Sequence, residues 1–263
     1  MNRILRNLIG PLRKRFSFPA PPAPAKPAPA SEFPPDFDES TKTICRTVRP
    51  YTMTSPERIN ALVGAVRYVA TNRIAGAIVE CGVWRGGSMM AVALALRELG
   101  DETRDLYLYD TYAGMPPPDD VDRAIDGLRA KERFQQAQTS ADPAHWSRCY
   151  SSLEEVRRNV LGTGYPQDKF HFIAGKVEET IPDRIPAEIA LLRLDTDWYE
   201  STRHEMIHLY PRLRPGGVLI IDDYGHWQGA RKAIDEFIAE RKLKLLLNRV
   251  DYTGRIAVKL PEA

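Results

Sequence analysis

The stretch Ala77–Ser88, AIVECGVWRGGS, changes from the pattern of a buried strand to that of a helix start. Its first four residues form an apolar run that ends on the carboxylate of Glu80, and three glycines follow in a short turn. Apolar residues at helical spacing then begin at Met89. Glycines let the backbone approach a ligand, Ser88 can cap the helix, and an acid at a strand end can accept hydrogen bonds from a ribose or an amino group. This pattern is typical of a nucleotide-binding turn.

The glycines of this turn do not have the spacing of either common phosphate-binding motif. Gly82, Gly86 and Gly87 fall at a four-then-one step instead of Gly-x-Gly-x-x-Gly, and the Lys-Ser/Thr of a phosphate loop is absent. Many ordinary strand-to-helix turns also need glycine, so the stretch by itself leaves a purely structural turn open.

Composition restricts the class of protein. The 263 residues are 43% hydrophobic and 27% charged, which fits one large α/β domain or two small ones. Six of the 37 basic residues lie in residues 1–31, leaving 31 basic against 35 acidic residues, a net charge near −4, in the rest. A mildly acidic body argues against a nucleic-acid partner. Three cysteines without metal or disulfide spacing favour a reducing cytoplasm, and no apolar run approaches the roughly 20 residues of a membrane span.

The amino-terminal part of the chain differs from the rest. Residues 1–18 are basic and include scattered apolar residues, which predicts a frayed tail or a short helix whose residues 1–15 make weak contact with the inner membrane surface. Residues 19–36 contain eight prolines and predict a semi-rigid Pro/Ala linker. The folded domain is expected over residues 37–263, beginning between Phe37 and Ile44, and a homo-oligomer is expected.

The body alternates strand and helix patterns with short connections. This predicts an α/β fold with one doubly wound, Rossmann-like, seven-stranded and mostly parallel sheet whose last strand is antiparallel. The expected strands are 77–80, 105–110, 169–175, 188–195, 218–221, 243–248 and 255–260, and the main expected helices begin at 56, 89, 151, 176, 200 and 229.

The long segment Thr111–Tyr150 interrupts this alternation. It contains three consecutive prolines, several acids and a polar helix-like stretch around Ala124 to Gln138. A segment of this length inside a compact domain is usually functional, so it is interpreted as a lid over an acceptor site.

Acidic residues follow the expected strands. Ligands of such sheets bind at the carboxyl ends of the strands, where Asp195 and the pair Asp222-Asp223 would meet if their strands are neighbours. Three carboxylates at that reach suit a hard divalent cation such as Mg²⁺, which could lower the pKa of a substrate hydroxyl while a carboxylate or His226 accepts the proton. The alternative for Asp222-Asp223 is a plain turn, and for Asp110 a cap on the turn after its strand. His226 could also be a further metal ligand or a loop histidine.

Aromatic and histidine residues near these acids leave two interpretations each. Trp198, Tyr199 and Trp227 could stack on a sugar or an aromatic acceptor, or could pack in the core. His204 and His208 are four residues apart on an expected helix, but without the glutamate of a zinc protease motif they are interpreted as helix-surface residues.

Four ordered blocks of this sequence together resemble the macrocin O-methyltransferase family, and the resemblance covers about Tyr51 to Leu260. The blocks are VECGVWRGGS at 79–88, YDTYAGMP at 109–116, LDTDWYEST at 194–202 and IDDYG at 221–225. Four blocks in order are far more specific than any one of them. The resemblance implies a class I methyltransferase fold, with S-adenosylmethionine as the methyl donor and Mg²⁺ on the acceptor side. The basic tail and the proline linker are outside this pattern.

The resemblance also implies roles for individual residues. Glu80, Gly82 and Ser88 would surround the methionine part of the donor, and Asp110 would hold its ribose. The loop Thr52–Ser55, with Met53 and Thr54, would contact the donor, and Gly175 and Lys176 at the end of the third strand are assigned to the same site. Asp195, Asp222 and Asp223 would hold the metal, with Asp195 as the general base.

The sequence therefore predicts an O-methyltransferase that transfers a methyl group from S-adenosylmethionine to a hydroxyl of a sugar, on a glycan or a glycosylated small molecule. One alternative is another nucleotide-sugar-modifying enzyme on the same fold, such as a dehydrogenase or an epimerase, which the missing dinucleotide glycine spacing disfavours. The other alternative is a non-catalytic binding module for glycan assembly, which the retained acids disfavour.

Overall fold

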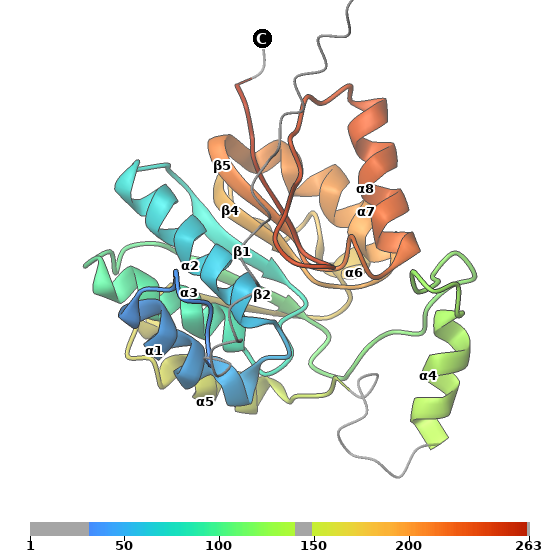
Figure 1. The fold of residues 1–263 in the computed structure, drawn as a ribbon, viewed down its shortest axis with the longest axis horizontal. Helices are drawn as coiled ribbons and strands as arrows, with labels where there is room; N and C mark the ends of the chain where they lie inside the picture. The colour runs from blue at the N-terminus through green and yellow to red at the C-terminus, as the bar shows by residue number, and fades with distance from the viewer. Residues whose placement is uncertain (1–31, 140–148, 262–263) are drawn as a thin grey trace, which may run out of the picture. The chain divides into compact units, whose positions relative to one another are not determined.

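A single sheet of seven strands runs through the computed structural model, which describes residues 32–139 and 149–261. Its order is β3-β2-β1-β4-β5-β7-β6, with β7 antiparallel to both of its neighbours and the remaining pairs parallel (Figure 1). The strands are β1 Ala77–Cys81, β2 Leu106–Asp110, β3 Phe170–Ala174, β4 Ile189–Leu194, β5 Leu213–Ile221, β6 Asn248–Arg249 and β7 Arg255–Val258. This order confirms the predicted α/β fold with a mostly parallel sheet.

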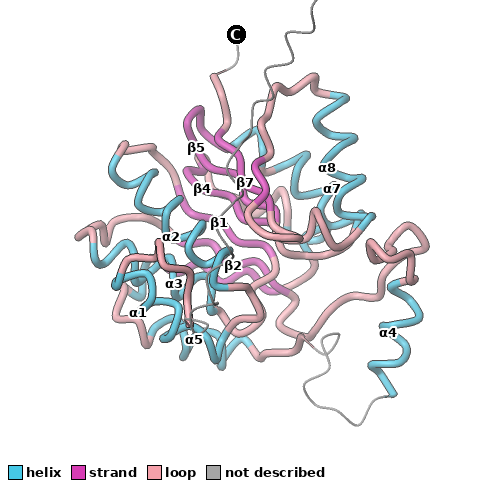
Figure 2. The backbone as a smooth tube through the Cα atoms, viewed as in Figure 1, coloured by secondary structure: helices cyan, strands magenta, loops and turns pink. Residues whose placement is uncertain are grey.

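Helices cover both faces of the sheet, as alternating strands and crossover helices require. One group contains α1 Glu39–Val48, α2 Pro56–Thr71, α3 Gly87–Glu98 and α5 Leu153–Leu161, and the other contains α6 Val177–Thr180, α7 Tyr199–His208 and α8 Gln228–Glu240 (Figure 1). The remaining helix, α4 Ala130–Thr139, stands away from the sheet (Figure 2). No helix among the described residues has the length and apolar character needed to cross a membrane.

The strand order fixes where a ligand can enter. The chain runs outward from β1 to β2 and β3, then returns to place β4 on the other side of β1. This reversal opens a crevice at the carboxyl ends of β1 and β4, the position at which doubly wound sheets bind ligands. The fold therefore brings the turn after β1 next to the Asp195 turn after β4.

The amino-terminal boundary adds one helix that the sequence patterns did not predict. A compact unit begins at Asp36, and α1 follows at once, capped by Asp38, whose carboxylate accepts the backbone N–H of Thr41 at 2.7 Å. Of the preceding unit only residues 32–35 are described, and they contain no helix or strand. The predicted tail over 1–18 and most of the predicted linker over 19–36 lie outside the described residues.

Four predicted elements differ most from the structure. The strand predicted over 243–248 pairs only at Asn248–Arg249, and the leucines at 243, 245 and 247 pack against the core without strand pairing. The helix predicted from 200 to 213 ends at His208, and β5 already starts at Leu213, before the predicted 218. The helix-like stretch expected from Ala124 becomes helical only at Ala130.

Candidate active site

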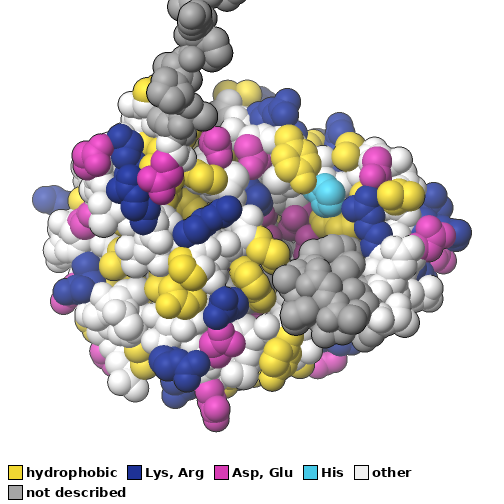
Figure 3. Space-filling view, turned by 60° about the horizontal axis from the view of Figure 1, so that its bottom comes forward, with side chains coloured by type: hydrophobic (Ala, Val, Ile, Leu, Met, Phe, Trp, Pro, Cys, Tyr) yellow, Lys and Arg dark blue, Asp and Glu magenta, His cyan; other side chains and the backbone are white. Residues whose placement is uncertain are grey.

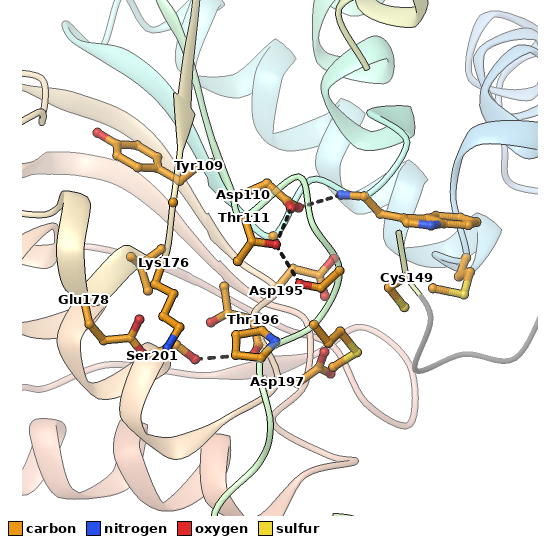
Figure 4. Close-up of a pocket in the computed structure, with 18 residues that line it drawn as sticks. Tyr109, Asp110, Thr111, Cys149, Lys176, Glu178, Asp195, Thr196, Asp197 and Ser201 are labelled. Atoms are coloured by element: carbon orange, nitrogen blue, oxygen red, sulfur yellow. Dashed lines mark hydrogen bonds between the residues drawn. The ribbon is translucent and has the colours of Figure 1, made fainter. Parts of the chain in front are cut away.

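Two adjoining pockets lie at the carboxyl ends of the strands. The wall of one of them, the first pocket, includes Gly82, Asp110, Gly175 and Lys176. Figure 4 labels Asp110 and Lys176 among its lining residues. The second, the acid pocket, is lined among others by Thr54, Glu80, Ser88, Asp222 and Asp223. Met53 and Asp195 line both pockets. The structure thus brings together every residue that the sequence assigned to donor or metal, although binding itself stays a prediction.

The turn after β1 is shaped by close backbone contacts. Gly82 has φ +83°, and a methyl group on it would lie 1.9 Å from the carbonyl oxygen of Asp195. No side chain fits at this distance, so only glycine allows the tips of β1 and β4 to meet. Gly86, at φ +89°, then starts α3 in the left-handed conformation. The predicted cap Ser88 lies instead inside the first turn of α3 and faces the acid pocket.

Asp110 organises the wall between β1 and β2. Its Oδ2 accepts the backbone N–H groups of Val83 at 2.7 Å and Trp84 at 3.0 Å, and its Oδ1 accepts that of Tyr112 at 2.7 Å. Burial raises the pKa of Asp110, and these backbone hydrogen bonds act in the opposite direction. The carboxylate therefore holds both turns in place, as the capping interpretation proposed, and also lines the first pocket.

Arg193 lies at the centre of the site, and the sequence analysis did not identify it. It lies in β4 with 3% of its side chain exposed. Its Nη1 donates to Glu80 at 2.6 Å and to Asp195 at 2.7 Å, and its Nη2 donates to Asp222 at 2.5 Å and to Thr54 at 3.2 Å. One guanidinium thus joins residues assigned to the donor with residues assigned to the metal.

Glu80 has one carboxyl oxygen bound and one without a partner. Oε1 accepts from Arg193, whereas Oε2 is buried and has no hydrogen bond. Burial raises the pKa of Glu80 to about 7, with Arg193 opposing that change. A buried acceptor without a partner at the wall of a pocket suits an ammonium group of a ligand.

The acids after β4 and β5 form one cluster. Asp195, Asp222 and Asp223 each offer an oxygen within 4.8 Å of the others. Burial raises the pKa of Asp195 and of Asp223, and their acidic neighbours add to the rise, while Arg193 opposes it at Asp195. Burial also raises the pKa of Asp197 to about 7, and Asp197 shares a hydrogen bond with Asp223. Acidic side chains lie recessed beside a histidine in Figure 3.

The charge balance of this cluster fits a divalent cation. Four clustered acids, at 195, 197, 222 and 223, are accompanied by two cations among the described residues, Arg193 and Arg58, and Arg193 is also shared with Glu80. Arg58 contacts the second oxygen of Asp222, so both oxygens of that residue already have partners. Asp195 and Asp223 are therefore the better placed of the three to offer oxygens to Mg²⁺, which prefers carboxylate ligands.

The aromatic residues near the acids divide between core and pocket. Trp198 and Trp227 are buried and pack edge to face with ring centres 5.0 Å apart. Trp227 also lines the acid pocket and donates its Nε1–H to Asp197 at 2.6 Å. His226 lines the same pocket with its Nδ1 3.2 Å from the hydroxyl of Tyr252, and burial lowers its pKa, which favours the neutral ring.

The other aromatic and histidine candidates lie elsewhere. The hydroxyl of Tyr199 donates to Glu236 at 2.7 Å. His204 bonds the carbonyl of Ile181 at 2.9 Å and packs on His208, with ring centres 4.4 Å apart. None of the three lines either pocket.

The segment interpreted as a lid is fixed at its first half. Asp122 is buried; its Oδ1 accepts the N–H of Tyr199 at 2.9 Å, and its Oδ2 accepts the N–H of Asp119 at 2.8 Å. The indole N–H of Trp198 donates to the carbonyl of Pro116 at 2.9 Å. From this base the segment contributes Met115 and Arg133 to the acid pocket.

Comparison with known proteins places the chain among methyltransferases. The family model described as Macrocin-O-methyltransferase (TylF) matches residues 25–258. A tetracenomycin rhamnosyl 4'-O-methyltransferase of Streptomyces olivaceus is 33% identical over 204 residues, covering 78% of this chain and 74% of that protein. Mycinamicin III 3''-O-methyltransferase of Micromonospora griseorubida is 32% identical over 187 residues, covering 71% and 70%. The solved structure of the O-methyltransferase NovP superposes with a TM-score of 0.69 at 28% identity, covering 80% and 83%.

Proposed function

Because the chain belongs to the macrocin O-methyltransferase family, and is therefore an S-adenosylmethionine-dependent O-methyltransferase, we propose that it methylates a sugar hydroxyl of a glycosylated small molecule with the help of a divalent cation. The relatives support the acceptor class, since their names specify hydroxyls of the rhamnosyl group of a tetracenomycin and of mycinamicin III. The acid cluster supports the cation.

The observation that carries the proposal is the position of Asp195. It lines both pockets, it belongs to the acid cluster, and 28% of its side chain is exposed. A carboxylate between a donor pocket and an acceptor pocket can accept a proton from a hydroxyl placed there.

In this proposal the donor lies in the first pocket and in the part of the acid pocket that Glu80 lines. Asp110, Gly175 and Lys176 would surround its nucleoside, and the free Oε2 of Glu80 would accept a hydrogen bond from its ammonium group. The donor supplies an activated methyl group, so the protein has mainly to align it with the acceptor hydroxyl.

The outer part of the acid pocket would hold the acceptor. A divalent cation bound by Asp195 and Asp223, with Asp222 beside it, would orient the acceptor hydroxyl and lower its pKa. Trp227, His226 and Tyr252 also line the acid pocket, as does Arg133 from α4. We propose that the segment 111–150 selects the acceptor, because Arg133 and Met115 come from it.

Calorimetry of donor and metal tests this assignment. S-adenosylmethionine and Mg²⁺ are titrated separately into the wild-type chain, into Asp223→Asn, and into the control Asp235→Asn, whose aspartate lies exposed on α8. We expect Asp223→Asn to weaken Mg²⁺ binding at least tenfold and to leave donor binding within about threefold, since a neutral amide is a poorer ligand. Asp235→Asn should change neither.

Turnover of the same proteins completes the test. A glycosylated acceptor related to those of the homologues serves as substrate, and transfer is followed with labelled donor. Asp195→Asn should abolish turnover while the donor still binds. Full activity of Asp195→Asn would remove this residue from the mechanism, and unchanged Mg²⁺ affinity in Asp223→Asn would refute the metal assignment.

A further inference from the structure

Glu205 is a buried carboxyl group in α7 without a cation beside it. Its exposed fraction is 0%, and no arginine or lysine in the described part of the chain forms an ion pair with it. Its Oε1 accepts a hydrogen bond from the hydroxyl of Thr196 at 2.9 Å, and its Oε2 is buried without a hydrogen-bond partner. Burial raises the pKa of Glu205 well above its usual range, which favours its uncharged form.

Thr196 is the middle residue of the turn that carries the site acids. Asp195 precedes it and Asp197 follows it at φ +67°, a conformation that residues other than glycine adopt rarely. The carbonyl oxygen of Thr196 accepts the N–H of Trp198 at 2.8 Å and the hydroxyl of Ser201 at 3.4 Å. Figure 4 shows Thr196 between Asp195 and Asp197 at the edge of the first pocket.

The hydroxyl of Thr196 links the turn to Glu205 of α7. The N–H of Trp198 and the hydroxyl of Ser201 hold its carbonyl oxygen, and Glu205 is the side-chain partner of its hydroxyl. A residue in the left-handed region persists only when its surroundings hold it there. Losing the Glu205 contact would therefore let the turn relax and would move the carboxyl groups of Asp195 and Asp197.

We propose that Glu205 is a positioning residue which, through its hydrogen bond to Thr196, holds the Asp195–Asp197 turn in the geometry that the metal site requires. The metal part of this inference depends on the proposed function, whereas the effect on the turn does not. A buried acid in an otherwise apolar core position is thus explained by the turn that it supports and not by stability.

Three variants separate positioning from a purely structural role. Glu205→Gln keeps an oxygen that can accept from Thr196, Glu205→Leu fills the space without an acceptor, and Thr196→Val removes the hydroxyl. Glu240→Gln, on an exposed side chain of α8 paired with Arg203, is the matched control. Melting temperature, Mg²⁺ affinity and donor affinity are measured for each.

We expect opposite effects of Glu205→Leu on stability and on the site. Its melting temperature should equal or exceed that of the wild type, because an apolar side chain replaces a buried carboxyl group. Its Mg²⁺ affinity should fall about 10-fold, the lower end of the usual loss for an outer partner of a metal ligand, because Glu205 acts on Asp195 only through Thr196. Thr196→Val should show the same loss, while Glu205→Gln and Glu240→Gln should stay within about threefold of wild type.

Hydrogen exchange reads the turn without metal or donor. Amide protons of residues 195–198 should exchange faster in Glu205→Leu and Thr196→Val than in wild type and Glu205→Gln. Unchanged exchange in both of these variants, or an equal loss in Glu205→Gln and Glu205→Leu, would overturn the inference. Absence of Mg²⁺ binding in the wild type would refute the proposed function, and the exchange experiment would still decide the role of Glu205.

Discussion

Replacing Arg193 with lysine tests whether one guanidinium holds the whole site. Lysine keeps the positive charge but replaces the planar, five-donor fork with a single ammonium group. The native side chain reaches Glu80 and Asp195 with one nitrogen and Asp222 and Thr54 with the other. A lysine in β4 cannot extend to both sides at once, so we expect about half of these contacts to be lost.

The size of the effect follows from the burial of the partners. A hydrogen bond between charged groups contributes about 1.5–3 kcal/mol, and breaking a buried ion pair costs about 3–5 kcal/mol. Glu80 and Asp222 are buried, with 1% and 5% of their side chains exposed, so solvent screens them little. We expect the free energy of unfolding to fall by about 3 kcal/mol, which lowers the melting temperature by about 6–12 °C for a domain of this size.

Activity should fall more than stability accounts for. Asp195 would lose its hydrogen bond to the guanidinium, and a displacement of about 1 Å at a reacting group typically costs about 100-fold in rate. The assay measures kcat at a temperature where the variant is folded, with saturating Mg²⁺ and donor. Arg104→Lys is the control, because Arg104 is mostly covered, with 10% of its side chain exposed, and donates to the carbonyls of Ile74 and Gly76 near the amino ends of the strands.

The control and the variant should differ in one respect. Arg104→Lys should lower the melting temperature and leave kcat within about twofold, whereas Arg193→Lys should lower both. A variant Arg193→Lys with the melting temperature and kcat of the wild type would refute the idea that this residue organises the site.

Two further predictions concern the donor and the lid. Donor affinity should weaken about tenfold from pH 8 to pH 6 as Glu80 takes up a proton near pH 7, and Glu80→Gln should bind donor at least tenfold more weakly at pH 8 with little pH dependence in calorimetry. Because the pKa of Glu80 is higher in the folded than in the unfolded state, the contribution of Glu80 to the free energy of unfolding should decrease as the pH rises from about 4.5 to 7. Glu80→Gln should reduce this slope in denaturant titrations. Asp122→Ala should cost about 1–3 kcal/mol by leaving the N–H groups of Tyr199 and Asp119 without their acceptor, and should raise KM for the acceptor more than for the donor; equal changes in both KM values would contradict the role of the segment as an acceptor lid.

Local patterns were sufficient to predict the strands that build the site. The apolar runs ending at Glu80, Asp110 and Asp195 predicted strands whose last residues face the pockets, because burial on both faces of a parallel strand requires such runs. The order of the strands was less accessible, since it depends on where β4 returns in the sheet. The acids could be grouped only by assuming that β4 and β5 are neighbours, which the pairing of Leu194 with Ile221 confirms.

The missed residues share a signal that was present in the sequence. Arg193 interrupts the apolar run of β4, and Glu205 occupies an inward position of α7. A residue of a charged type inside a buried element requires a polar partner. Arg193 and Glu205 therefore each indicated a buried polar contact, but the sequence did not identify the partner. The partners come from separate segments of the chain, and only the folded structure brings them within hydrogen-bond distance.

The two missed residues explain how the acid cluster can exist before any ligand binds. Like charges at this distance repel strongly when buried, and a cluster of four carboxylates without counter-charges would protonate or open. Arg193 and Arg58 neutralise Asp222, and Arg193 also pairs with Asp195, whereas Asp197 and Asp223 form no ion pair with a basic side chain in the described part of the chain. In the proposed role Glu205 would hold the turn that carries Asp195 and Asp197, and the burial that raises its pKa disfavours a further negative charge there. The chain therefore holds the carboxyl groups in position while leaving Asp197 and Asp223 without an ion-paired cation among the described residues, a deficit that the proposed divalent cation would fill.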